Sequence, residues 1–389
     1  MVSSREDGTL RIGFSTSVVQ RGKSGVGQYV FALLRAMLPY SSEHEFHLFV
    51  LEEDLLLFDF AKGAMKVVPV GEGWRPAVKN ILWHQSRLPS LARELKLDVL
   101  HTPSYRRMLW SRPCPLVSTI HDLAPFYITN KYDWKRMFYG RVVVKRLAQR
   151  QDEIIAVSEQ TSRDVKNFFG LNSNRVSVIW NGIDHTRFRS GEVSTADAAG
   201  RWHLERPFFL YVSRLEHPGK NHVRLIRAFG QFKTDTGSDW LLAFAGSDWH
   251  GSDVIHAAAR GSRFAKDIRF LGFVADSALP DLYRSTGVFV YPSLFEGFGF
   301  PPVEAMACGC AVISSTRGSL REVIGDAALT VDPEDTGEIA KALSYMTLHA
   351  EERGRWREKG FANARRFNWN DTAKRTMEIY QRAVRRRSR

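Results

Sequence analysis

The chain has 389 residues, of which 44% are hydrophobic and 25% are charged, and this balance is typical of a folded protein with about two domains. No run of 18 apolar residues is present, which argues against a membrane-spanning helix. The first residues also lack the basic and then apolar segments of a secretory signal, so we expect a cytoplasmic protein. The three cysteines, Cys114, Cys308 and Cys310, follow no disulfide or zinc pattern, so we predict plain packing and no metal site.

The net charge is +13, and two clusters of basic residues contribute much of it. In residues 131–150, cations alternate with apolar side chains as they do on an amphipathic helix. The second cluster lies between Lys374 and Arg389 at the end of the chain. Both clusters fit solvated helix faces, and both also fit peripheral contact with an anionic membrane or a lipid-phosphate acceptor. Because no nucleic-acid-binding motif is present, we expect no nucleic-acid partner.

Short apolar segments alternate with longer amphipathic segments through the first half of the chain. Strands are predicted over residues 11–15, 45–50, 65–70, 99–102, 116–119, 153–157 and 176–179. A helix is predicted over residues 25–38, where the apolar side chains fall on one face, and helical segments separate most of the strands. This alternation indicates a parallel sheet covered by helices on both sides.

The alternation weakens between residues 181 and 206, and the polar stretch 190–200 is the best candidate for a linker. A second series then follows, with predicted strands at 208–212, 241–245, 268–272, 288–291, 311–314 and 328–331, and helices at 222–233 and 368–385. We therefore predict an α/β protein with two Rossmann-like, doubly wound parallel-sheet domains that face a cleft. The domains would be residues 1–190 and 201–367, with the terminal helix and basic tail, 368–389, packing back towards the first domain.

A glycine-rich segment, residues 21–27, follows the first predicted strand and opens a helix. Gly25 and Gly27 would let the backbone approach an anion, and a helix N-terminus attracts negative charge, so a diphosphate is the natural ligand. The same segment could also be a tight strand-to-helix turn. It resembles the end of a P-loop, but Ser17 replaces the glycine with which that motif begins.

Two cations, Arg214 and Lys220, follow the first strand of the second half and surround a glycine-containing turn. Guanidinium and ammonium groups in that place could neutralise a departing diphosphate, and the alternative is a plain surface location. The single histidine after the 116–119 strand, His121, fits either a structural or an active-site role.

Two glutamates, Glu296 and Glu304, are separated by seven residues and follow the predicted strand 288–291. Pro301-Pro302 suits a helix start, so Glu304 is expected in the first turn of a short helix and Glu296 in the loop before it. A carboxylate accepts hydrogen bonds well from vicinal hydroxyls, so one glutamate could hold a sugar and the other a ribose. Backbone N–H groups of the 297–300 loop could donate to sugar hydroxyls. A pair of hydrolase carboxylates is the alternative, but placement on a loop and a helix does not set the separation that such a pair needs.

The E-x7-E pattern from Glu296 to Glu304 resembles the signature of the family 4 retaining glycosyltransferases, which have the GT-B fold. The resemblance covers nearly the whole chain. It includes the pair Arg214 and Lys220 and the segments 22–27, 156–159, 181–184, 270–274 and 318–323. The overall pattern is most similar to bacterial mannosyltransferases of polysaccharide assembly.

The resemblance implies a retaining, nucleotide-sugar-dependent hexosyltransferase, with an acceptor-side first domain and a donor-binding second domain. GDP-mannose is the first expected donor and a UDP-hexose the second, and the acceptor would be a saccharide or a lipid-linked oligosaccharide. The implied catalytic residues are His121, Glu296, Arg214 and Lys220. The implied donor contacts are Gly25, Gly27, Arg214, Lys220, Phe273, Val274, Gly297, Phe298, Gly299 and Glu304.

His101 is a lesser candidate for lining the acceptor side. No acidic metal-binding motif follows a strand in a suitable place, so we expect the protein cations to replace a divalent ion, with no cofactor. The alternatives are a sugar-nucleotide epimerase or a glycogen-type synthase on the same fold, a P-loop NTPase, and an inactive sugar-binding subunit.

Overall fold

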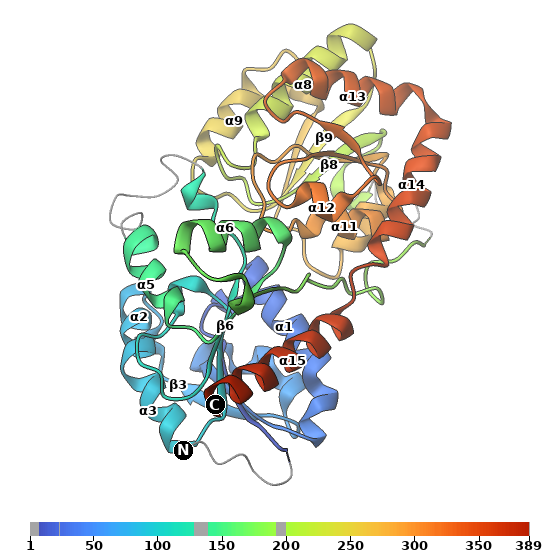
Figure 1. Ribbon diagram of the computed structural model, residues 1–389. Coiled ribbons are helices and arrows are strands. Elements are labelled where there is room, and N and C mark those ends of the chain that lie inside the picture. The colour runs from blue at the N-terminus through green and yellow to red at the C-terminus, as the bar shows by residue number, and fades with distance from the viewer. Residues whose placement is uncertain (1–7, 23, 128–138, 192–199, 389) are drawn as a thin grey trace. The chain divides into compact units, whose positions relative to one another are not determined.

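The computed structural model describes residues 8–22, 24–127, 139–191 and 200–388. Contacts divide the chain into two compact units, the first formed by residues 1–182 and 368–389 and the second by residues 183–367. Each unit is built on its own parallel sheet, with seven strands in the first and six in the second (Figure 1). The prediction of two Rossmann-like parallel-sheet domains is therefore confirmed.

The sheet of the first unit has the strand order β3-β2-β1-β4-β5-β6-β7, and all its neighbours are parallel. Its strands are β1 (Arg11–Ser15), β2 (Glu45–Leu51), β3 (Lys66–Val70), β4 (Val99–Thr102), β5 (Leu116–Ile120), β6 (Glu153–Ala156) and β7 (Val176–Val178). Every predicted strand of this half is present, with ends that differ by at most one residue. The central strands read as nearly continuous buried segments because helices cover both faces of a doubly wound sheet.

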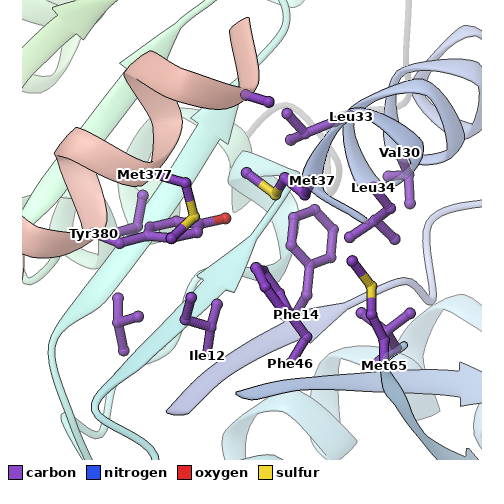
Figure 2. Close-up of a cluster of buried hydrophobic side chains, with 14 of the residues drawn as sticks. Ile12, Phe14, Val30, Leu33, Leu34, Met37, Phe46, Met65, Met377 and Tyr380 are labelled. Atoms are coloured by element: carbon purple, nitrogen blue, oxygen red, sulfur yellow. The ribbon is translucent and has the colours of Figure 1, made fainter. Parts of the chain in front are cut away.

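Helices surround this sheet on both faces. The α-helices are α1 (Gly25–Met37), α2 (Ala77–Gln85), α3 (Arg87–Glu94), α5 (Val144–Gln149), α6 (Glu159–Phe169) and α15 (Trp369–Ser388). The short helical turns are η1 (Gln20–Gly22), η2 (Leu38–Ser42), η3 (Glu52–Ala61), η4 (Glu72–Trp74), η5 (Tyr105–Arg107), η6 (Ala124–Phe126), η7 (Tyr139–Val143) and η8 (Ser173–Arg175). Figure 2 shows α1 and α15 over one face of this sheet, where Phe14, Leu33, Met377 and Tyr380 form part of a buried apolar cluster.

The terminal basic cluster fastens α15 to the first unit. Glu153 at the start of β6 is fully buried, and its carboxylate receives hydrogen bonds from Arg382 at 2.9 and 2.7 Å and lies 2.8 Å from Arg386. Arg375 donates to the carbonyl of Val178 at 2.7 Å, at the end of β7. Much of the charge in this cluster therefore serves to satisfy a buried carboxylate and backbone carbonyls, a role that the sequence analysis did not consider.

The first basic cluster is described only in part, because residues 128–138 lie outside the described residues. The remainder forms η7 and α5, in which Val144 and Leu147 are buried while Lys145 and Arg146 are exposed. This part has the amphipathic pattern that the sequence predicts. In the described part of the chain, no helix has both the length and the apolar character that crossing a bilayer requires.

The sheet of the second unit has the order β10-β9-β8-β11-β12-β13, again fully parallel. Its strands are β8 (Phe208–Val212), β9 (Leu241–Ala245), β10 (Ile268–Gly272), β11 (Val288–Tyr291), β12 (Val312–Ser315) and β13 (Leu329–Val331). Its helices are α8 (His222–Thr236), η9 (Ala265–Asp267), α9 (Ser252–Arg260), α10 (Leu279–Ser285), α11 (Phe300–Ala307), α12 (Leu320–Ile324), α13 (Thr336–Leu348) and α14 (Ala350–Ala364). The cysteines Cys114, Cys308 and Cys310 are free and buried.

The boundary between the units lies at residues 182/183 rather than near residue 190. The backbone N–H of Ile183 bonds to the carbonyl of Phe367 at 3.2 Å, and Arg284 on α10 donates to the carbonyl of Arg189 at 3.1 Å. Residues 183–190 thus pack with the second sheet, although their sequence continues the first series. Most of the predicted linker, 192–199, lies outside the described residues.

Both sheets share one topological feature that positions ligands. In each, the chain starts at an inner strand, extends the sheet to one side, and then returns to extend it on the other side. The order reverses between β1 and β4 and between β8 and β11. Ligands of doubly wound sheets bind outside the carboxyl ends of the strands at such a reversal, which directs attention to the loops that follow these four strands.

We expect Arg382→Ala to lower the free energy of unfolding by about 2 kcal/mol, because it removes two hydrogen bonds from the buried Glu153 carboxylate. The loss stays below that of a fully broken buried pair since Arg386 still binds the carboxylate. Urea unfolding would measure the change. Arg385→Ala, at an exposed position on the same helix, is the control and should change stability by less than about 0.5 kcal/mol. Equal stability of the two variants would contradict the fastening role.

Candidate functional site

The order reversal of the second sheet brings together two loops that are far apart in sequence. The loop between β8 and α8 contains Arg214 and Lys220, and the loop between β11 and α11 contains Glu296. Because β8 and β11 are hydrogen-bonded neighbours, their carboxyl ends lie at the same edge of the sheet. The two predicted motifs therefore meet at the place where a doubly wound sheet binds ligands.

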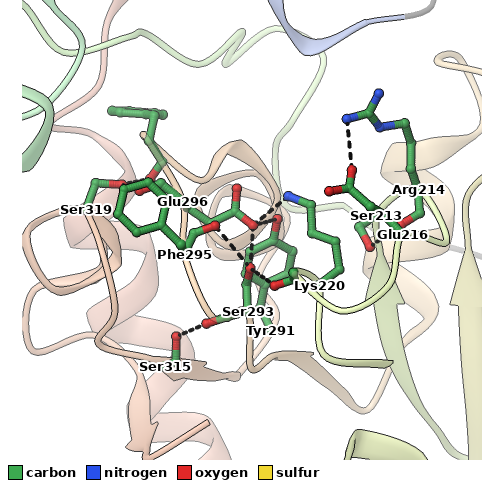
Figure 3. A network of polar contacts seen from close by, with 12 residues as sticks. Ser213, Arg214, Glu216, Lys220, Tyr291, Ser293, Phe295, Glu296, Ser315 and Ser319 are labelled. Carbon is green, nitrogen blue, oxygen red and sulfur yellow. Dashed lines mark hydrogen bonds and ion pairs between the residues drawn. The ribbon is translucent and has the colours of Figure 1, made fainter. Parts of the chain in front are cut away.

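Lys220 and Glu296 form an ion pair at this edge. The Lys220 ammonium lies 2.6 Å from Oε1 of Glu296, and the two side chains are 19% and 12% exposed. The same oxygen accepts hydrogen bonds from the Tyr291 hydroxyl at 2.9 Å and from the Ser293 hydroxyl at 2.6 Å (Figure 3). The sequence assigned separate roles to the lysine and the glutamate, whereas the structure couples them directly.

The loop that carries Glu296 is held by the segment before α12. The carbonyl of Glu296 accepts hydrogen bonds from both the backbone N–H and the hydroxyl of Ser319, each at 3.0 Å. Gly318 has a φ of +62°, and a Cβ at this position would lie 2.5 Å from the Glu296 carbonyl oxygen. A side chain at residue 318 would therefore displace the Glu296 loop, which gives the 318–323 motif a physical reason.

Arg214 is held between a carboxylate and an aromatic ring. Its guanidinium lies 3.3 Å from Glu216 and 4.8 Å from the centre of the Trp249 ring. Backbone hydrogen bonds between Leu215 and the β9–α9 loop, from Leu215 to Ser247 and from Trp249 to Leu215, join the two loops. Figure 3 shows that the side chains of Arg214 and Lys220 extend towards the same side of their loop, and this arrangement suits an anion.

Glu304 lies on α11, which begins at Phe300 behind Gly299. The helix starts one residue before Pro301, so Glu304 is its fifth residue and lies just past the first turn in which it was predicted. The Tyr283 hydroxyl donates to Oε2 of Glu304 at 3.0 Å. Burial raises the pKa of Glu304 to about 7, against the smaller opposing effect of the positive charge of Arg187.

The predicted donor-binding residues around the two glutamates differ in the exposure of their side chains. Phe273, just after β10, is 66% exposed, and Val274 beside it is partly buried. Gly297, Phe298 and Gly299 are buried, and the Phe298 ring packs against Phe300 and Phe367. The Phe273 ring is thus available for stacking, while the Phe298 side chain belongs to the core and only the backbone there could meet a ligand.

The candidate residues of the first unit lie after β1 and β5. Ser24 caps α1 by accepting a hydrogen bond from Gly27 at 3.0 Å, while Lys23 lies outside the described residues. A Cβ on Gly25 would meet no atom within 4 Å, whereas one on Gly27 would lie 2.8 Å from the Val19 carbonyl oxygen. Gly25 therefore offers open space at the helix N-terminus, and Gly27 is required for packing.

His121 follows β5 and packs edge-on against Tyr29 of α1, with ring centres 4.6 Å apart. Its Nε2–H donates to the Pro103 carbonyl at 3.2 Å, which leaves Nδ1 as the acceptor of a neutral ring. Burial lowers the pKa of His121 to about 4, so the imidazole is uncharged near pH 7.

His101 does not line an acceptor surface, so its expected role is wrong. It is fully buried on β4, with Nδ1 2.6 Å from the Tyr380 hydroxyl and Nε2 2.8 Å from the Thr119 hydroxyl. Burial lowers its pKa to about 3. The helix α15 covers this strand. Because α15 is so distant in sequence, the local sequence pattern around His101 could not predict this cover.

Several partners of the predicted residues were not predicted from the sequence. They are Tyr291 and Ser293 at Glu296, Tyr283 and Arg187 at Glu304, and Trp249 at Arg214. The position of Tyr291 and Ser293 at the end of a predicted strand was an available signal for them. Across the described ranges, no three His, Cys, Asp or Glu side chains gather as metal ligands would.

Two doubly wound sheets, with cations and carboxylates after β8 and β11, are the features of glycosyltransferases with the GT-B fold. Residues 23–187 match the family model described as Glycosyltransferase Family 4, and residues 194–362 match the model described as Glycosyl transferases group 1. These two models together span most of the chain. The chain belongs to this family of glycosyltransferases, as its sequence motifs predict.

Two relatives from Escherichia coli show how the similarity is distributed. The chain is 29% identical over 306 residues to the O-antigen chain mannosyltransferase B, which covers 77% of this chain and 78% of that protein. It is 28% identical over 286 residues to the serotype-specific mannosyltransferase WbdA, covering 70% of this chain. That match spans only 34% of WbdA, so the chain corresponds to about a third of that relative.

Solved structures show the fold at lower identity. The Anabaena protein HepE, crystallised in complex with UDP and glucose, superimposes with a TM-score of 0.76 at 19% identity, covering 96% of this chain and 99% of HepE. WaaG, a glycosyltransferase involved in lipopolysaccharide biosynthesis, superimposes with a TM-score of 0.71 at 14% identity, covering 95% of this chain and 99% of WaaG. These likenesses confirm the GT-B fold of the chain.

We expect Glu304→Gln to stabilise the protein at pH 8 but not at pH 4. The folded-state pKa of about 7 exceeds the ordinary 4.5, so between these values the folded state keeps a proton that the unfolded state has lost, and stability falls as pH rises. A neutral side chain escapes this loss, which amounts to at most about 3.5 kcal/mol at about 1.4 kcal/mol per pKa unit.

Chemical unfolding at the two pH values would measure the difference. Glu358→Gln, at an exposed position on α14, is the matched control and should change little at either pH. An equal effect of Glu304→Gln at pH 4 and pH 8 would contradict the raised pKa.

Proposed function

We propose that this glycosyltransferase transfers mannose from GDP-mannose, with retention of the anomeric configuration, to a saccharide or lipid-linked oligosaccharide during polysaccharide assembly. The observation that carries the proposal is the Lys220–Glu296 ion pair, with Arg214 nearby, after the strands where the sheet order reverses. The two mannosyltransferase relatives support mannose as the transferred sugar. The first of these relatives is named as an O-antigen chain mannosyltransferase, which supports a polysaccharide product.

Charge that develops on the departing diphosphate would be stabilised by Lys220 and Arg214. An ammonium group has three N–H donors, and Glu296 uses one of them, so two remain for phosphate oxygens. The Arg214 guanidinium offers a planar pair of donors and is held in place by Trp249 and Glu216. Such preorganised cations act without reorganisation when the bond breaks, which is why we propose a reaction that needs no metal ion.

The two glutamates would bind different parts of the donor. Glu296 would accept a hydrogen bond from the transferred sugar. Glu304 would accept one from the ribose through Oε1, because the Tyr283 hydroxyl binds Oε2 and no described residue donates to Oε1. The exposed ring of Phe273, with Val274 beside it, would stack on the nucleobase. Backbone N–H groups from Gly297 to Gly299 would complete the sugar contacts.

From the first unit, we assign a role near the reacting centre to His121 and a contact with the diphosphate to the Gly25–Gly27 turn. The neutral ring of His121 presents Nδ1 as an acceptor, which suits a sugar hydroxyl better than an anion. Retention would proceed by attack of the acceptor hydroxyl on the face that the diphosphate leaves, with a phosphate oxygen taking the hydroxyl proton. The anomeric C–O bond to phosphate breaks as the new glycosidic bond forms.

A lipid-linked acceptor would bring the enzyme to an anionic membrane surface. The exposed cations Lys145 and Arg146 on α5, next to the partly exposed Val142, support such a contact. This attachment would be peripheral and would weaken as salt screens the charges.

The test is a thermal-shift screen of the protein with GDP, UDP and ADP and with their hexose conjugates, followed by NMR of the product anomer. A ligand that binds only the folded state raises the melting temperature, and we expect the largest rise with GDP-mannose. An α-linked product from the α-linked donor would support retention, and the rate should persist with EDTA. A UDP-hexose that alone shifts the melting temperature would replace the donor, and a free epimer or ATP hydrolysis would overturn the proposal.

We expect Lys220→Ala to reduce kcat by two orders of magnitude or more, because it removes a charge that stabilises the departing diphosphate. Initial-rate kinetics with the donor identified by the screen would measure the loss. The fold should survive, since Tyr291 and Ser293 still bind Glu296. Lys341→Ala, exposed on α13, is the matched control and should keep the wild-type rate. A wild-type rate in Lys220→Ala would refute the assigned role.

A further inference from the structure

Among the residues that the structure describes, the hydrogen-bond partners of the Glu296 carboxylate all bind one of its two oxygens. Oε1 accepts three hydrogen bonds, from Lys220 at 2.6 Å, Tyr291 at 2.9 Å and Ser293 at 2.6 Å. Oε2 accepts none from any residue that the structure describes, and Figure 3 shows it directed away from the three donors. The carboxylate therefore has one saturated oxygen and one open oxygen.

The two hydroxyl donors come from buried residues at the end of a central strand. Tyr291 is the last residue of β11 and is 2% exposed, and Ser293, two residues later, is fully buried. The Tyr291 ring packs against Tyr211 and Phe289, with ring centres 5.2 and 5.9 Å apart. The orientation of the carboxylate is thus set by the end of a central strand, whereas Glu296 itself lies on a loop.

We propose that Tyr291 and Ser293 are positioning residues, which fix Glu296 so that Oε2 alone is presented to a hydroxyl group of the transferred sugar. This inference rests on the proposed function. A carboxylate that could rotate would lose conformational freedom on binding the sugar, and fixing it in advance removes that cost.

Three donors at one oxygen of Glu296 make its orientation independent of Lys220. If Lys220 alone held Glu296, any movement of the ammonium towards the diphosphate would release the carboxylate. With Tyr291 and Ser293 in place, Lys220 can shift to phosphate while Glu296 keeps its orientation. Binding of the diphosphate and orientation of the sugar are therefore separable, and this separation can be measured.

The experiment compares Tyr291→Phe, Ser293→Ala and the double variant with the wild type. We expect each single variant to lower kcat about tenfold, as for loss of a hydrogen bond to a charged group, and the double variant to lower it about a hundredfold. The affinity for the free nucleoside diphosphate, measured by calorimetry, should stay within about twofold. Tyr291→Phe keeps the aromatic ring and Ser293→Ala removes only a hydroxyl, so both single variants should fold. If the double variant does not fold, the single variants alone provide the test.

Donors that each lack one sugar hydroxyl identify the contact. The wild type should lose turnover with the analogue that lacks the hydroxyl bound by Oε2. The double variant should turn over this analogue almost as fast as it turns over the complete donor. Tyr380→Phe is a matched control, because its hydroxyl is buried and bonds His101 rather than Glu296. It should retain the wild-type response to every analogue.

Three results would decide against the inference. Wild-type turnover in both single variants would overturn it, as would a parallel loss of nucleoside diphosphate affinity, which would indicate a general structural role. An unchanged analogue response in the double variant would do the same. A wild type that transfers no sugar from any donor would instead defeat the proposed function, so the two failures are distinguishable.

Discussion

The pairing of β8 with β11 is the constraint on which the candidate site depends. These strands are separated by 75 residues of chain, yet they are hydrogen-bonded neighbours, and the loops that follow them must leave the sheet at the same edge. This places the Lys220 ammonium 2.6 Å from the Glu296 carboxylate. Without that pairing, the cation and the acid would be isolated surface charges, and their hydrogen bonds would be worth little against water.

Charge in this protein serves two different physical purposes. Around Glu296, partly exposed charges are held by buried hydroxyls so that they remain available to a ligand. The fully buried carboxylate of Glu153 is instead paired with arginines from the end of the chain, and these ion pairs hold α15 on the first sheet. The strongly basic composition therefore reflects internal fastening as well as attraction of anionic partners, and net charge alone cannot distinguish the two.

Burial shifts the pKa of two candidate site residues, Glu304 and His121. It raises the pKa of Glu304 and lowers that of His121, so both favour their neutral forms relative to free side chains. The nearby charge of Arg187 opposes the shift of Glu304 but is outweighed by burial, so ionisation of this side chain costs folding free energy. A cost of this kind is common where function and stability compete, which is consistent with the binding role that we propose for Glu304.

The sequence by itself determined the elements and the family of the protein. Apolar runs located all the strands to within one residue, because side-chain burial in a doubly wound sheet leaves a local pattern, and glycines and the Glu296–Glu304 spacing marked the candidate ligand loops. Only the tertiary structure decided which of these residues meet. The ion pair of Lys220 with Glu296, the burial of His101 beneath α15 and the use of Arg382 at Glu153 all join segments far apart in the chain. Periodicity reports how each segment is buried, but strand order and long-range packing determine its partners, and these leave no local trace.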